Sequence, residues 1–113
     1  MNKSIILAIL LYAIGQLMVW FQSNGQFFWE FFKKNPILIS FIGIPVSYIF
    51  IKATSMSYDG FGQLWPGRMI GFATGVIIFA ILSWSIMGEN ISLKTGACLL
   101  LSVAIIYIQL FVK

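Results

Sequence analysis

The chain has 113 residues and a formal net charge of +4; 60% of its residues are hydrophobic and only 9% are charged. A soluble domain carries about 25% charged residues, so this chain has too few charges to cover a surface that faces water. It has no histidine and a single cysteine, Cys98, which excludes a Ser-His-Asp triad, a histidine-ligated metal and a disulfide within the chain. Seven basic residues are too sparse for a nucleic-acid-binding stripe, and a membrane protein is the class that remains.

Charged residues divide the chain into four long apolar segments. A membrane-spanning helix needs about 20 apolar residues, and in lipid such a run must be helical to satisfy its own backbone. The sequence therefore predicts an all-α integral membrane fold, with a single domain over 1–113. Its four transmembrane helices are expected at about 4–22, 36–54, 66–87 and 93–112.

The first apolar segment is expected to remain as a membrane anchor. Its apolar run exceeds the roughly 7–15 residues of a signal peptide, and no small-residue cleavage site follows it. Tyr12 and Gln16 lie one helical turn apart in this segment and share a face. Polar groups are costly inside a membrane, so these two side chains either line a cavity or hydrogen-bond across a helix interface.

The connections and their prolines carry further local signals. Segment 27–34 mixes aromatic rings with charges, which favours a helical turn at the membrane interface. Pro36 suits the first turn of the second helix, and Pro45 predicts a kink inside it. Asp59 and Gly60 are the sharpest turn signal in the second connection.

Two basic residues flank that second connection. Lys52 ends the second predicted helix and Arg68 begins the third. Both either snorkel to lipid headgroups or face an inner cavity, where they would favour an anionic group such as a phosphate. Trp65 joins Tyr12, Gln16, Lys52 and Arg68 as a candidate for lining that cavity. No Asp or Glu falls near the middle of a predicted helix, so a membrane carboxylate is not available for proton coupling.

Small residues form a regular strip along the third predicted helix. Gly67, Gly71 and Gly75 are spaced four residues apart, which doubles the small-xxx-small pattern. Such a strip marks either tight static packing or a helix that slides during a conformational cycle, and packing is the favoured interpretation. In the connection between the third and fourth predicted helices, Ser92 is well placed to cap the fourth helix, and Glu89 lies near the start of that helix.

The orientation signal is nearly neutral. An even number of spans puts both termini on one side. That side carries four basic residues, Lys3, Lys52, Arg68 and Lys113. The opposite side carries three, Lys33, Lys34 and Lys94. A partner or the Lys33 and Lys34 pair then decides the orientation, or the chain inserts both ways and pairs antiparallel.

Three segments together resemble the small multidrug resistance family and the wider drug/metabolite transporter superfamily. They are AILLYAIGQLMVWF from Ala8, QLWPG over 63–67, and ILSWSIMGENISLKTGACLLLSVAIIYI from Ile81, and the similarity is clearest over 79–109. The resemblance implies a four-helix transporter of the cytoplasmic (inner) membrane that works as a homodimer by alternating access. The family pairs through its fourth helix. The candidates for helix packing or dimer contact are therefore Gly67, Gly71, Gly75, Gly96 and Ser102.

The chain departs from that family where its mechanism lies. The family uses a first-helix glutamate, and here Tyr12 takes that position; a tyrosine is not anionic at neutral pH. The family's third-helix tyrosine falls on Gly62. Proton-coupled export of cationic drugs is therefore not expected. Gly15, Gln16 and Leu17 resemble the paired subunits that flip a lipid-linked aminoarabinose on undecaprenyl phosphate, whose headgroup Lys52 and Arg68 would suit.

Two functional hypotheses of different classes follow. The first is a small transporter that moves a small metabolite or a lipid-linked headgroup. The second is a non-transporting membrane subunit that keeps the fold and stabilises or regulates a partner protein. A membrane enzyme is not expected, because the apolar segments hold no carboxylate pair, metal cluster or nucleophile with a base. The sequence predicts no cofactor and no metal.

Overall fold

The computed structural model describes residues 3–112, so Lys113 of the charge balance lies outside the described residues. Within that range every regular element is helical. They are α1 (Lys3–Asn24), the 3₁₀ turn η1 (Gly25–Phe27), α2 (Glu30–Lys34), α3 (Pro36–Ser40), α4 (Gly43–Phe61), α5 (Trp65–Ile86) and α6 (Leu93–Phe111). Four spans are long and apolar enough to cross a membrane: Lys3–Phe27, Pro36–Phe61, Trp65–Ile86 and Leu93–Phe111. The predicted all-helical fold with four such spans is confirmed at this level.

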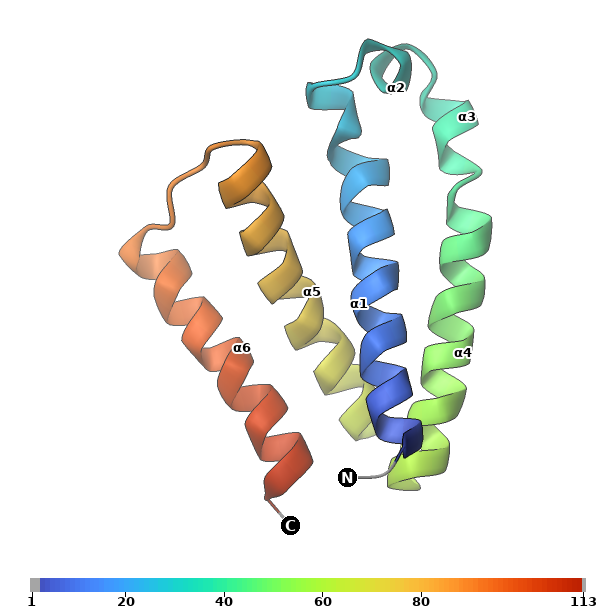
Figure 1. The fold of residues 1–113 in the computed structure, drawn as a ribbon, viewed down its shortest axis with the longest axis vertical. Coiled ribbons are helices and arrows are strands. Elements are labelled where there is room, and N and C mark those ends of the chain that lie inside the picture. Colours follow the sequence, from blue (N-terminus) through green and yellow to red (C-terminus); the bar gives the residue numbers. More distant parts are fainter. Residues whose placement is uncertain (1–2, 113) are drawn as a thin grey trace.

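Helix α1 is the centre of the arrangement (Figure 1). It packs along α4 and also against α5, whereas α4 and α5 contact each other much less. Helix α6 packs chiefly on α5 and stands at the edge of the molecule. The start of α1 and the end of α6 lie at the same end of the bundle, as an even number of spans requires.

The second span is broken between α3 and α4, where Pro45 predicts a kink. Pro45 has no N–H to donate to the carbonyl four residues back, which is that of Phe41. The Phe41 carbonyl accepts instead from the Ile44 N–H at 3.1 Å. Gln22 of α1 donates its Nε2 to the carbonyls of Ile39 (3.3 Å) and Ser40 (3.4 Å) at this break. The Ile39 carbonyl also accepts the Ile42 N–H at 3.0 Å, so of these two carbonyls it is that of Ser40 for which Gln22 supplies a donor in place of the helix backbone.

The second span ends later in the structure than the sequence predicts. Helix α4 continues to Phe61 instead of 54, and the turn predicted at Asp59 and Gly60 is wrong because both residues are helical. Gly62 ends the helix in the left-handed conformation, with φ 75°, and its N–H bonds the Tyr58 carbonyl at 2.7 Å. Only glycine adopts this conformation without steric cost, so Gly62 stops the helix. The ends of the other three long helices, α1, α5 and α6, agree with the predictions within two residues.

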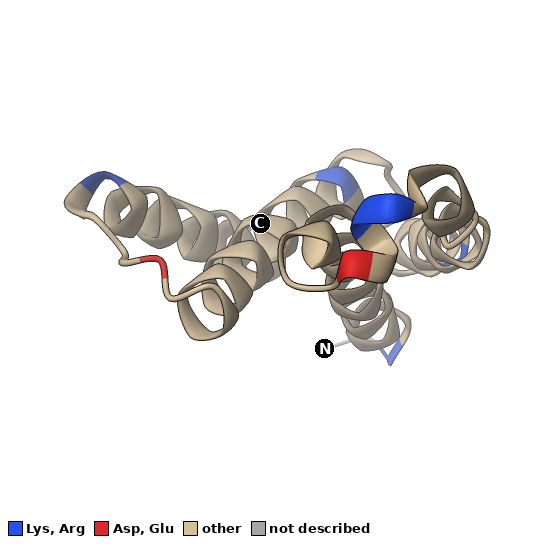
Figure 2. Cartoon of the chain, turned by 90° about the horizontal axis from the view of Figure 1, so that it is seen from above, with Lys and Arg blue, Asp and Glu red and all other residues tan. Residues whose placement is uncertain are grey.

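The short connections follow their local signals. Helix α2 is the helical turn expected among the aromatic and charged residues, and it carries an ion pair between Glu30 and Lys34 at 3.1 Å. Ser92 caps α6 as predicted, because its Oγ accepts the Thr95 N–H at 3.2 Å. Figure 2 looks down on the α2 end and shows how few positions along the ribbon are charged.

Candidate functional site

The main concavity is a groove of about 890 Å³ between α4 and α5, with α1 contributing to its wall. It combines aromatic rings, neutral polar groups and a single cation. The lining residues are Tyr12, Gln16, Phe50, Thr54, Ser57, Gln63, Leu64, Trp65, Gly67, Arg68, Gly71 and Phe72. The groove exists because α4 and α5 both pack on α1 but diverge from each other.

Tyr12 joins the three helices at the groove. Its side chain is buried, and its hydroxyl shares a hydrogen bond of 3.4 Å with Thr54 Oγ1 on α4. On the α5 side its ring lies over Gly71, where an added Cβ would come within 3.1 Å of the ring. A glycine at position 71 therefore allows the tyrosine ring to approach the α5 backbone.

Gln16 lies one turn along α1 and ties the same two helices. Its Nε2 donates to the Gly71 carbonyl at 3.4 Å, and its amide lies over Gly75, where a Cβ would come within 2.8 Å. The two interpretations of Tyr12 and Gln16 from the sequence both match the structure. The side chains line a groove and also hydrogen-bond across helix interfaces.

The glycine strip of α5 faces the inside of the same chain. Gly67 lies against Ser57 of α4, and Gly71 and Gly75 lie against Tyr12 and Gln16 of α1. These three glycines therefore lie in packing contacts between helices of the same chain.

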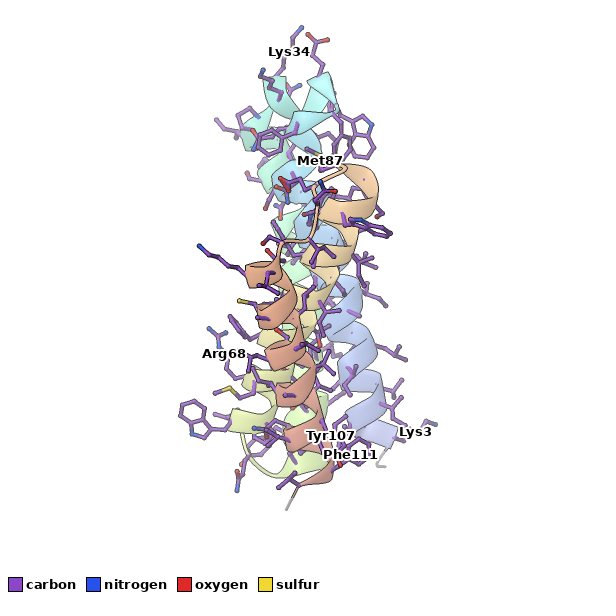
Figure 3. The ribbon with its side chains drawn as sticks, turned by 90° about the vertical axis from the view of Figure 1, so that its left-hand side faces the viewer. Lys3, Lys34, Arg68, Met87, Tyr107 and Phe111 are labelled. Atoms are coloured by element: carbon purple, nitrogen blue, oxygen red, sulfur yellow. The ribbon has the colours of Figure 1, made fainter. Side chains whose placement is uncertain are left out.

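Arg68 and Trp65 stand at the exposed side of the groove. Trp65 is 69% exposed, and Arg68 projects outward from the half of the molecule nearer Tyr107 than Lys34 (Figure 3). The ion pair between Glu30 and Lys34 is the one salt bridge within residues 3–112, so Arg68 has no carboxylate partner there. No Asp or Glu lines the groove. Arg68 is therefore the one charged residue of the groove, and no carboxylate in the lining offsets it.

Three other predicted residues lie away from the groove. Lys52 is exposed on α4 and does not line it. Gly96 of α6 is open, since an added Cβ would meet only Ile91, at 4.0 Å. Ser102 is buried on α6, and its hydroxyl donates to the Cys98 carbonyl at 3.0 Å. The structure therefore brings together four of the five cavity candidates and leaves Lys52 outside.

The predicted cavity candidates do not include Gln63 of the connection after α4, or the two polar groove residues of α4, Thr54 and Ser57. The latter two lie three residues apart on α4, a spacing that puts them on one helix face. A helix predicted to end at 54 leaves Ser57 in a connection, where it belongs to no helix face. The sequence analysis also does not predict the hydrogen bond between Trp20 and Ser83. The Trp20 indole N–H donates to Ser83 Oγ at 3.2 Å.

The described part of the chain has no cluster of three or more His, Cys, Asp or Glu residues that could hold a metal ion. No family model, curated protein or solved structure matches the chain, so the small multidrug resistance resemblance stays a prediction.

Proposed function

We propose that the chain is a small transporter of the drug/metabolite type, similar to the small multidrug resistance proteins, in the cytoplasmic membrane. It moves a small metabolite or a lipid-linked headgroup that carries an anionic group, by alternating access. The observation that carries this proposal is the groove between α4 and α5, which holds the Arg68 cation and no carboxylate.

The groove chemistry supports an anionic, amphipathic ligand. A guanidinium forms charge-assisted hydrogen bonds with a phosphate or a carboxylate, and such bonds are stronger where water is scarce. Gln16 and Gln63 add neutral donors, while Phe50 and Phe72 offer apolar surface to the rest of the ligand. A cationic drug would meet Arg68 without a compensating carboxylate, so the glutamate-based antiport of the family is not proposed.

The binding step is tested with single-tail probes of different headgroup charge. We expect protein in dodecyl maltoside to bind dodecyl phosphate and not dodecyltrimethylammonium, with the change in intrinsic tryptophan fluorescence as the readout. Arg68→Gln should weaken dodecyl phosphate binding about tenfold, since a hydrogen bond to a charged group contributes roughly 1.5–3 kcal/mol. Lys52→Gln, an exposed cation outside the groove, is the matched control. Stronger binding of the cationic probe, or equal affinity of Arg68→Gln and wild type, would refute the proposal.

The transport step is tested in liposomes with a panel of anionic metabolites and lipids. The variant Tyr12→Phe plus Gln16→Ala removes the hydroxyl and the amide that join α1 to α4 and α5 in the groove. We expect it to lose uptake of the substrate that wild type accepts. Uptake at the wild-type rate by this double variant would show that these two residues are not part of the transport site.

A second function, the non-transporting membrane subunit, is favoured by one observation. Helix α6 packs chiefly on α5, and most of its surface is exposed, including Leu100 (74%) and Leu101 (65%). That surface suits either a second copy of this chain or a different protein. A pull-down in mild detergent separates the two: recovery of self-dimers alone argues against the subunit function.

A further inference from the structure

A second, smaller cavity of about 100 Å³ lies between α1 and α5, beside the groove. Its lining residues are Gln16, Val19, Trp20, Ser23, Asn24, Gly75 and Phe79. None of them is charged. Gln16 is the one residue among 3–112 that lines both this cavity and the groove.

Both cavities follow the same seam between α1 and α5, which run in the same direction (Figure 1). On α1, Tyr12 of the groove lies four residues before Gln16, and Ser23 of the smaller cavity lies seven residues after it. These spacings put the three side chains on one helix face. On α5, Phe72 of the groove and Phe79 of the smaller cavity are seven residues apart and also share a face. The smaller cavity therefore continues the groove toward η1.

The Gln16 amide lies where the two cavities meet. Its Nε2 donates to the Gly71 carbonyl at 3.4 Å, and within residues 3–112 this is the one hydrogen bond of the side chain. An N–H···O bond is usually about 2.9–3.0 Å long, so this bond holds the amide weakly. The amide fills the space that Gly75 leaves without a side chain, since a Cβ there would lie 2.8 Å from Gln16 Cδ. A rotation of this one side chain would therefore join the two cavities.

The smaller cavity suits water and uncharged polar groups. Ser23 is exposed and brings a hydroxyl to its lining, whereas the cation Arg68 belongs to the groove. The volume of the cavity exceeds the share of about 30 Å³ that one water molecule occupies in the liquid. Water can therefore reach the Gln16 amide from the η1 side as well as from the groove.

We infer that the groove and the smaller cavity are two compartments of one water-accessible path along α1 and α5, and that the Gln16 side chain is the barrier between them. The inference rests on the proposed function, because alternating access requires a barrier that closes the path on one side of the ligand. It assigns Gln16 a role beyond hydrogen bonding: the bulk of the side chain closes the path.

Osmotic shrinkage of proteoliposomes, followed by light scattering, tests the barrier with water as the probe and in either orientation of the chain. Wild type should shrink at the rate of protein-free vesicles. Gln16→Ala removes the amide and should shrink several-fold faster. Gln16→Ser is also short and should behave in the same way, so the test does not depend on the folding of one variant.

Two controls separate the bulk of the side chain from its hydrogen bond. Gln16→Leu keeps the bulk without the amide, and its vesicles should shrink as slowly as those of wild type. Leu17→Ala truncates the neighbouring residue, which is exposed and lines neither cavity, and should also leave the rate unchanged.

Three results would refute the barrier. They are equal rates for Gln16→Ala and Leu17→Ala, a rate for Gln16→Leu as fast as that for Gln16→Ala, and fast shrinkage of wild-type vesicles. Uptake of anionic metabolites or lipids by wild type is measured separately. If wild type takes up none of them and Gln16→Ala still admits water, the proposed function fails and the barrier stands.

Discussion

At the scale of residues, a few polar side chains of α1 hold the bundle together. Trp20 is 3% exposed and donates its indole N–H to Ser83 of α5, while Trp29, Trp65 and Trp84 are all at least 45% exposed. With Tyr12 and Gln16 it forms a row of polar contacts along one side of α1. The hydrophobic pattern could not reveal the partners of this row, because they lie on other helices.

The Trp20 and Ser83 pair should show coupled energetics. Trp20→Phe leaves the buried Ser83 hydroxyl without its donor, so we expect a loss of about 1–3 kcal/mol of stability. In the Ser83→Ala background the same change should cost clearly less. Unfolding of the two single variants and the double variant in mixed micelles measures the coupling. Strictly additive effects would show that the bond contributes nothing.

The glycines of α5 and α6 should respond in opposite directions. Gly67→Ala places a methyl group against Ser57 and Tyr12, and we expect it to destabilise the fold by about 1–3 kcal/mol. Gly96→Ala meets open space and should stabilise α6 by about 0.5–1 kcal/mol through helix propensity. Thermal unfolding of the two variants checks this contrast. Destabilisation by Gly96→Ala would place that glycine in a contact outside the chain.

At the scale of elements, the four spans were predictable and their interruptions only partly. Long charge-free runs predict the spans, and Pro45 predicts the break in the second because its ring removes a specific hydrogen bond. The end of α4 was not predictable from composition. Asp59 and Gly60 have the stronger turn signal, but Gly62 adopts the left-handed conformation that ends the helix. That error also hid Ser57 from the predicted site.

The break between α3 and α4 should depend on Gln22. Gln22→Leu removes the donor to the carbonyls of Ile39 and Ser40, and we expect a loss of about 1–2 kcal/mol. Pro45→Ala restores an N–H that can bond the Phe41 carbonyl, so Gln22→Leu should cost less in that background. Chemical unfolding of all three variants measures the difference. An equal loss of stability on Gln22→Leu in both backgrounds would show that Gln22 does not stabilise the break.

At the scale of the whole molecule, α6 is the least integrated helix. It packs chiefly on α5 and leaves a row of large apolar side chains exposed, whereas α1 is covered by two neighbours. The sequence pattern gives four equivalent apolar spans and no indication of which one stands at the edge. A homodimer, which the resemblance to the small multidrug resistance family implies, would cover α6.

Pairing into a homodimer would double the mass of the protein component in detergent. Light scattering in mild detergent should give about twice 12.7 kDa for the protein component. Leu100→Trp plus Leu101→Trp enlarges the exposed side of α6 and should shift the protein toward monomer. Ile37→Trp, at a position of α3 that is 79% exposed, is the control and should remain dimeric. A monomeric wild type would contradict pairing through α6.

The central position of α1 has a consequence for how the chain is made. Helix α1 is synthesised before the helices on which it packs. Thr54 follows its partner Tyr12 by 42 residues, and Ser83 follows its partner Trp20 by 63. At a synthesis rate of about 5–20 residues per second, Trp20 waits roughly 3–13 s for its acceptor. During those seconds the nascent first helix carries unpaired polar groups. Its full set of hydrogen bonds to other helices can form only when α5 has been translated.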